Sequence, residues 1–208
     1  MQQRVERPNG LLRVLETSPR MGDGYRLAMA RWFDYKASDF DERAHRASIH
    51  IDLQDIALPD ASLDLVLTPH VLEHVPETDR ALAELHRVLV PGGRLLLQVP
   101  ILQGATAPPT EPEFHDDNTP VFWRFGPDLV DRLRAHGFVT RLLCPRQWLD
   151  EVIVGRSDRV RQFPEFDVDS MLAGSRVDDL EPILDTPMAE RLGLWEPYQF
   201  LVFEGVRR

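Results

Sequence analysis

Three side chains that can exchange protons lie within one five-residue segment, His70-Val71-Leu72-Glu73-His74. Imidazole titrates near neutral pH, so a histidine here can act as a general base on a bound substrate. Two imidazoles and a carboxylate can also bind a divalent metal ion, in a softer site than one made only of oxygen ligands. The residue types therefore allow acid–base chemistry or a metal site, and the spacing alone leaves both open.

The order H-x-x-E-H is also that of the inverted zinc metallopeptidase motif. That motif needs its two histidines one turn apart on a continuous helix. Here residues 62–68, just before the segment, favour a strand, and Pro76 follows the segment almost at once. The sequence therefore argues against zinc proteolysis.

Two carboxylates follow short apolar runs upstream of this segment. Residues 35–39 and 47–51 are predicted strands, and they lead to Asp39 and Asp52. One carboxylate can accept hydrogen bonds from two donors, which suits it to hold a ligand. Asp41 and Glu42 compete with Asp39 for this role. The structural alternatives are a solvated acidic turn at Asp39 and a turn cap at Asp52.

A further histidine lies in a long loop. Residues 104–125 are rich in Pro and Thr and contain His115. A loop of this length in a compact domain is usually functional or disordered. Because it follows a predicted strand, it lies where open parallel sheets bind their ligands, beyond the carboxyl ends of the strands. We therefore expect a substrate wall here, with His115 as a second candidate base.

The elements that position these residues follow from hydrophobic periodicity. Residues 62–68 form a short apolar run after a Pro-Asp turn signal, as expected of a buried strand. From Thr78 onward the apolar residues recur at helical spacing, residues 91–93 (Pro-Gly-Gly) end that helix, and residues 94–99 read as the next strand. Strand, helix and strand with short links form a right-handed parallel crossover.

Other predicted elements extend this pattern on both sides. They are a strand at residues 11–15 ending at Glu16, a helix at 25–33, a helix at 126–137, a strand at 138–144 and a final strand at 198–206. Residues 146–194 interrupt the last two strands. Two weakly helical pieces fall in that insertion, around 168–172 and 186–192, and it reads as a cap over the site or as the surface of a homodimer.

The stretch from Asp52 to Pro100 carries a recognisable order: Asp, then P-D-x-S-x-D-L-V, V-L-E-H-V and E-L-x-R-V-L-x-P-G-G-x-L-L. This order closely resembles class I S-adenosylmethionine-dependent methyltransferases, in the group that includes the ubiquinone-biosynthesis methyltransferases. The resemblance implies an α/β fold with a Rossmann-like doubly wound sheet of about seven strands, the last antiparallel. It implies one domain over residues 1–208, with residues 104–125 as substrate loop and 146–194 as a helical cap insertion before the last strand.

The resemblance also implies a site and a reaction. S-adenosylmethionine would be the cofactor, with Asp39 at its ribose and Asp52 and Leu53 at its adenine. The residues implied in cofactor binding are Glu16, Thr17, Ser18, Asp39, Asp52, Leu53 and Thr68. His74 and His115 would be the catalytic residues, on the acceptor side. The reaction would be in-line displacement of the methyl group onto a small-molecule acceptor, with O-methylation favoured over C- or N-methylation.

The loop after the first strand departs from the family pattern. The family has an acidic residue followed by three closely spaced glycines. Here the sequence from Glu16 is E-T-S-P-R-M-G-D-G, and the first glycine comes six residues after Glu16. One interpretation is a remodelled loop that still binds the cofactor. The alternative is a loop that no longer does so, which would make the protein a methyltransferase-like, non-catalytic binding or partner subunit.

The sequence does not decide whether the segment from His70 to His74 binds a metal ion. Some metal-dependent methyltransferases carry E-x-x-E-H at this place, and this chain has His70 where they have the first Glu. His70, Glu73 and His74 are thus an alternative divalent-metal site, which we do not favour. The simpler interpretation is that Glu73 and His74 shape the acceptor pocket.

The composition of the chain limits the classes of partner and the cellular compartment that we expect. The formal net charge of -10 argues against a nucleic acid or an anionic membrane as main partner, since both need a basic face. The chain has no apolar run of about 18 residues and no signal-peptide pattern after Met1. We therefore expect a cytoplasmic protein, and the resemblance implies that its partner is a small-molecule acceptor.

Overall fold

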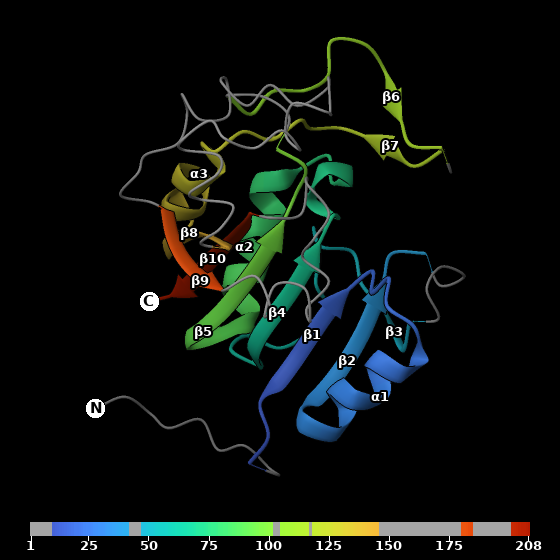
Figure 1. The fold of residues 1–208 in the computed structure, drawn as a ribbon, viewed down its shortest axis with the longest axis vertical. Helices are drawn as coiled ribbons and strands as arrows, with labels where there is room; N and C mark the ends of the chain where they lie inside the picture. Colours follow the sequence, from blue (N-terminus) through green and yellow to red (C-terminus); the bar gives the residue numbers. More distant parts are fainter. Residues whose placement is uncertain (1–9, 42–46, 102–104, 117, 146–179, 185–200) are drawn as a thin grey trace.

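A mixed β-sheet forms the centre of the fold (Figure 1). The computed structural model describes residues 10–41, 47–101, 105–116, 118–145, 180–184 and 201–208. Within them the sheet has eight strands in the order β3-β2-β1-β4-β5-β10-β8-β9. Their bounds are β1 Arg13–Thr17, β2 Asp34–Asp39, β3 Ile49–His50, β4 Leu63–Pro69, β5 Leu89–Gln98, β8 Phe138–Pro145, β9 Leu180–Leu184 and β10 Val202–Arg207.

The directions of the strands confirm the predicted fold class. Strands β1 to β5 pair in parallel, whereas β10 is antiparallel to both of its neighbours, β5 and β8. The sheet is therefore the Rossmann-like one expected from the sequence, with its last strand antiparallel. Strand β9 adds an edge that the sequence did not predict, and it pairs in parallel with β8.

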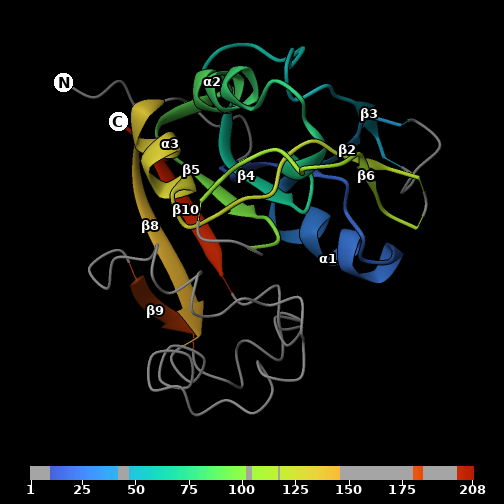
Figure 2. The same cartoon turned by 90° about the horizontal axis from the view of Figure 1, so that it is seen from above.

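Helices lie on both faces of the sheet. Figure 2 shows α1 (Asp23–Trp32) on one face and α2 (Thr78–Val88) and α3 (Leu129–Ala135) on the other. Helix α2 buries Ala81, Leu82, Leu85 and Val88, which recur at helical spacing and form one apolar stripe. Burial of each larger side chain stabilises the fold by about 1.5–3 kcal/mol. None of the described helices is long and apolar enough to cross a membrane.

The start of β1 and the start of β5 differ from the predicted bounds. Leu11 and Leu12 precede β1, which begins at Arg13, where the backbone N–H and the guanidinium both donate to Asp64. Glu16 thus lies within the strand. Strand β5 begins at Leu89, directly after α2, and residues 91–93 form an irregularity inside it instead of a separate turn. Glycine is required there, because Gly92 has φ +79°.

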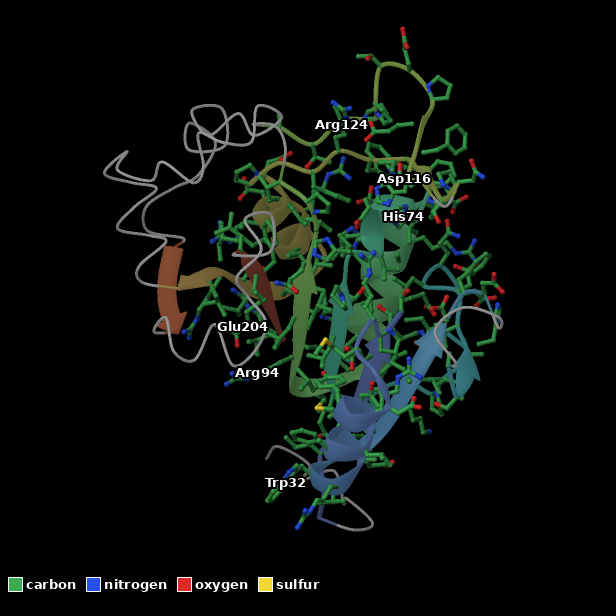
Figure 3. The ribbon with its side chains drawn as sticks, turned by 45° about the vertical axis from the view of Figure 1, so that its right-hand side comes forward. Trp32, His74, Arg94, Asp116, Arg124 and Glu204 are labelled. Atoms are coloured by element: carbon green, nitrogen blue, oxygen red, sulfur yellow. The ribbon has the colours of Figure 1, made fainter. Side chains whose placement is uncertain are left out.

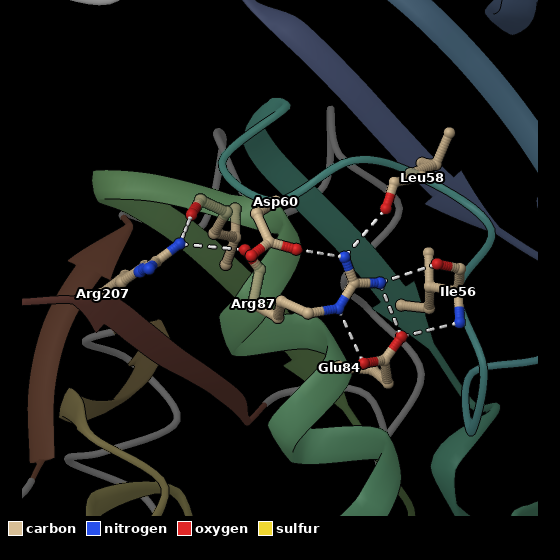
Figure 4. A network of polar contacts seen from close by, with 7 residues as sticks. Ile56, Leu58, Asp60, Glu84, Arg87 and Arg207 are labelled. Carbon is tan, nitrogen blue, oxygen red and sulfur yellow. Dashed lines mark hydrogen bonds and ion pairs between the residues drawn. The ribbon is translucent and has the colours of Figure 1, made fainter.

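Arg87 connects α2 to residues 56–60, the segment that follows the predicted adenine site (Figure 4). Its guanidinium donates to both carboxylate oxygens of Glu84 at 2.7 Å, to Asp60 at 2.6 Å and to two backbone carbonyls, those of Ile56 and Leu58. Glu84 in turn accepts the backbone N–H of Ile56 at 2.9 Å. The turn after residues 52–54 is therefore anchored to a helix that is buried along one face.

The long loop between β5 and α3 contains structure that the sequence did not predict. Its described residues include a small antiparallel hairpin of β6 (Glu113–Phe114) and β7 (Pro120–Val121). The proposed cap, residues 146–194, lies outside the described residues except for β9. The two helical pieces expected in it are likewise outside them, so that part of the fold stays a prediction.

Candidate functional site

A cavity of about 710 Å³ opens at the carboxyl ends of the parallel strands. Ligands of open α/β sheets bind in this position. The wall comes from the turn after β1, the end of β2, residues 51–54, the short 3₁₀ helix η1 (Leu72–His74) with its flanks, and the β6–β7 hairpin. Figure 1 shows that hairpin beyond the arrowheads of β1, β2 and β4. The volume lies within the range of about 300–1,000 Å³ that small-molecule sites have.

One end of the cavity carries carboxylates. Asp39 is the last residue of β2, is only 8% exposed, and accepts the backbone N–H of Asp41 on Oδ1 at 3.0 Å. Asp52 accepts the backbone N–H of Gln54 at 2.8 Å and its side-chain amide at 3.2 Å. Asp52 is therefore a turn cap as well as a residue of the cavity wall. Leu53 also lines the wall, so the three residues expected at ribose and adenine lie together.

Of the residues expected to bind the cofactor near the end of β1, some line the cavity and others are buried behind its wall. Thr17 and Ser18 line the cavity, whereas Glu16 and Thr68 are not among the lining residues. Glu16 is 5% exposed and accepts a 2.6 Å hydrogen bond from the Tyr35 hydroxyl. Burial raises the pKa of its carboxyl, and the hydrogen bond from Tyr35 opposes the rise. Thr68 is fully buried and accepts a 2.9 Å hydrogen bond from Thr17.

The other end of the cavity carries imidazoles. His70, His74 and His115 all line it. The Nδ1 atom of His74 lies 2.7 Å from the backbone oxygen of Pro120. Because a carbonyl only accepts, Nδ1 carries the proton, and Nε2 is the basic nitrogen of the neutral ring. The rings of His74 and His115 meet edge to face with centroids 4.8 Å apart. Both candidate bases therefore lie side by side.

Glu73 lies behind these imidazoles. Its side chain is 2% exposed, and one carboxyl oxygen is 3.8 Å from His70 Nδ1 and 3.8 Å from His74 Nε2. Neither oxygen accepts a hydrogen bond from another described residue. Burial raises the pKa of Glu73 to about 7, and burial also lowers the pKa of His70 to about 4. Near neutral pH His70 is therefore neutral, and Glu73 is about half protonated.

This arrangement bears on the alternative metal site at His70, Glu73 and His74. Among the described residues, no three His, Cys, Asp or Glu side chains are arranged so that they could hold a metal ion. The hydrogen bond from His74 Nδ1 to Pro120 leaves Nε2 as the nitrogen that faces Glu73. The alternative metal site stays a prediction.

The hairpin is fastened over the imidazole end by its own backbone. The carbonyl of Glu73 accepts the N–H groups of Phe122 and Trp123, at 2.9 and 3.2 Å. The Trp123 indole donates to the carbonyl of Pro76 at 3.0 Å, and its ring packs against the core. Figure 3 shows His74 at this end of the sheet and Trp32 at the opposite end. The loop over residues 104–125 therefore contributes to the wall of the cavity, and its contact with a substrate stays a prediction.

Some wall residues were given no role by the sequence. Arg20, Phe40 and Phe122 also line the cavity. Phe40 is 67% exposed. Its position directly after Asp39, a predicted site residue, was the available signal in the sequence. Arg20 follows Pro19 in the atypical loop, and its positive charge beside the predicted cofactor residues Thr17 and Ser18 was the available signal.

Comparison with known proteins adds independent findings. Residues 27–97 match a family model described as a methyltransferase domain. An S-adenosylmethionine-dependent methyltransferase from Mesorhizobium loti has a similar structure, with a TM-score of 0.56 and 18% identity over 95% of this chain and 92% of that one. The 1,6-didemethyltoxoflavin N1-methyltransferase of Burkholderia thailandensis, solved with 1,6-didemethyltoxoflavin and S-adenosylhomocysteine, gives a TM-score of 0.52 and 17% identity over 93% of this chain and 70% of that one.

A sequence relative matches over a shorter stretch. It is an uncharacterized 37.1 kDa protein in transposon TN4556 of Streptomyces fradiae, 47% identical over 49 residues. Those residues are 24% of this chain and 14% of that protein. The two structural likenesses, both under 20% identical, establish the fold and carry no information on the acceptor.

Proposed function

We propose that this protein transfers a methyl group from S-adenosylmethionine to a small-molecule acceptor. The proposal is supported by the match of residues 27–97 to a family model described as a methyltransferase domain and by the likeness of the fold to S-adenosylmethionine-dependent methyltransferases. The observation that carries the proposal is that one cavity is lined by two unlike sets of polar side chains on opposite sides of β1. Asp39 and Asp52 follow β2 and β3 on one side, and His74, in contact with His115, follows β4 on the other. Such a cavity can hold two different reactants next to each other, as a transfer reaction requires.

The carboxylate end fits the cofactor. Asp39 ends β2 beside the switch point of the sheet, where a carboxylate can accept hydrogen bonds from both ribose hydroxyls. Asp52 would accept from the adenine amine, and the backbone N–H of Leu53 would donate to the ring. Bound S-adenosylmethionine supplies a methyl group that is already activated on a sulfonium sulfur. The protein therefore has to hold and align the reactants, with little covalent chemistry of its own.

The imidazole end fits an acceptor that must lose a proton. His74 Nε2 is the basic nitrogen, since Nδ1 donates to Pro120. It would take the proton from an acceptor hydroxyl as oxygen attacks the methyl carbon in line with the departing sulfur. His115, in edge contact with His74, would assist in holding the acceptor. This basic nitrogen is the reason we favour O-methylation over C- or N-methylation.

Titration calorimetry with S-adenosylmethionine and S-adenosylhomocysteine tests the proposal, with Asp39→Asn as the variant. Asparagine keeps the Oδ1 acceptor for the Asp41 N–H but loses the charge and the second acceptor. Hydrogen bonds to charged groups contribute about 1.5–3 kcal/mol, so binding should weaken by about ten- to a hundredfold. Asp34→Asn is the matched control, because Asp34 is exposed at the opposite end of the same strand and should leave binding unchanged.

The alternative is a non-catalytic binding subunit that has lost the cofactor. The turn after β1 favours it, because Ser18 donates its backbone N–H to Ser38 at 2.7 Å and Pro19 has none to offer. The same titration separates the two functions. Absence of binding heat and of a thermal shift with millimolar cofactor would exclude the enzyme and leave the binding subunit.

A further inference from the structure

The turn after β1 has few backbone donors to offer an anion. Ser18 turns the chain with φ +48°, and its N–H donates to the carbonyl of Ser38. Pro19 has no N–H. The next glycines, Gly22 and Gly24, lie at the N-cap of α1 and inside it, and not in this turn. A ligand carboxylate at this end of the cavity therefore needs another partner.

Arg20 stands where that partner is needed. It lines the cavity together with Thr17 and Ser18, and among the described residues of the wall it is the one Lys or Arg. In the described part of the chain its side chain makes no hydrogen bond or ion pair. Arg20 follows β1, which lies between β2 and β4 in the sheet. Arg20 therefore lies between the carboxylates that follow β2 and β3 and the imidazoles that follow β4.

The charges of the wall leave one place for an anionic group. Asp39, Asp41 and Asp52 line the cavity and would repel a carboxylate, whereas they suit hydroxyl and amine donors. A guanidinium matches a carboxylate with two parallel hydrogen bonds. We propose that Arg20 binds the carboxylate of the methionine part of the cofactor, in place of backbone N–H groups of a glycine loop. This inference rests on the proposed function, and it assigns a cofactor contact to a residue of the remodelled turn.

Two ligands that differ in the amino-acid part test the inference. S-adenosylhomocysteine carries the carboxylate, and 5′-methylthioadenosine keeps the nucleoside thioether without it. Arg20→Gln should weaken binding of S-adenosylhomocysteine by at least about tenfold and leave 5′-methylthioadenosine within about twofold. Arg20→Lys should fall between, since an ammonium keeps the charge but not the paired geometry. Arg31→Gln is the control for lost charge, because Arg31 is exposed on α1 beside Trp32 and does not line the cavity.

The outcomes separate this inference from the proposed function. If the wild-type protein binds S-adenosylhomocysteine and Arg20→Gln binds it equally well, the role of Arg20 is overturned while the methyltransferase proposal stands. An equal loss for both ligands would also overturn it, because the effect would then not depend on the carboxylate. If the wild type binds neither ligand, the proposed function is wrong, and the inference about Arg20 is wrong as well. Thermal melts of each variant show whether the fold is retained.

Discussion

Replacing Glu73 by Gln should remove a pH dependence of stability that the buried carboxyl creates. The side chain is 2% exposed, and its pKa is raised by burial to about 7 from an ordinary 4.5. In the unfolded chain the carboxyl ionises near 4.5, whereas in the folded protein it keeps its proton up to about 7. The unfolded state therefore binds fewer protons in this window, and the wild type loses stability as pH rises through it.

The magnitude follows from the size of the shift. One pKa unit corresponds to about 1.36 kcal/mol, so the 2.5 units between 4.5 and 7 correspond to about 3 kcal/mol above pH 7. Glutamine has the shape of the neutral acid and cannot ionise. Glu73→Gln should thus differ from the wild type by less than about 1 kcal/mol at pH 5 and be more stable by about 3 kcal/mol at pH 8.5.

Urea unfolding of both proteins from pH 5 to pH 8.5 measures this difference. Glu77→Gln is the matched control, because Glu77 lies four residues on and its side chain is 67% exposed. The free energy of unfolding below pH 6.5 provides an internal control for the measurement. His70 is held neutral with its pKa lowered by burial to about 4, so both proteins should lose stability as pH falls below 6.5. Parallel curves across the alkaline range would refute the argument, since they would mean that Glu73 is not held protonated by burial.

Two further substitutions test the contacts that position the site. Tyr35→Phe removes the 2.6 Å hydrogen bond to buried Glu16 and should cost about 1–3 kcal/mol in urea unfolding; a loss below about 0.5 kcal/mol would show that Glu16 does not depend on it. Arg87→Lys cannot keep both hydrogen bonds to Glu84 and those to the backbone carbonyls, and should cost about 1–2 kcal/mol. Arg134→Lys, at an ion pair with exposed Asp131, should change stability by less than about 0.5 kcal/mol, and an equal loss at both positions would argue against the network.

The parts of the fold that were predicted are those with a strong local pattern. Helix α2 was visible because its apolar residues recur at helical spacing, and β4 was visible as an apolar run behind a turn. The β6–β7 hairpin was not, because strands of two residues such as Glu113–Phe114 are too short to show a period. Strand β9 lies in a segment whose weak helical pattern gave no sign of pairing with β8.

The site was predictable where a residue's place depends on a strand end. Asp39, Asp52 and His74 reach one cavity because the carboxyl ends of parallel strands meet at one edge. The partner of Glu16 was not predictable, because Tyr35 meets it only through the pairing of β1 with β2. Likewise, no local pattern reveals that Glu73 lies behind the imidazoles instead of in the wall.

The hydrogen bond between His74 and Pro120 links two parts of the proposed reaction. The carbonyl that fixes the proton on Nδ1 belongs to the hairpin, not to the segment that carries the histidine. Without that carbonyl the neutral ring could place its proton on either nitrogen. The hairpin therefore fixes the tautomer of His74 and forms part of the cavity wall at the same time. In the proposed reaction, a change that displaces Pro120 would alter the shape of the acceptor pocket and the basic nitrogen of His74 together.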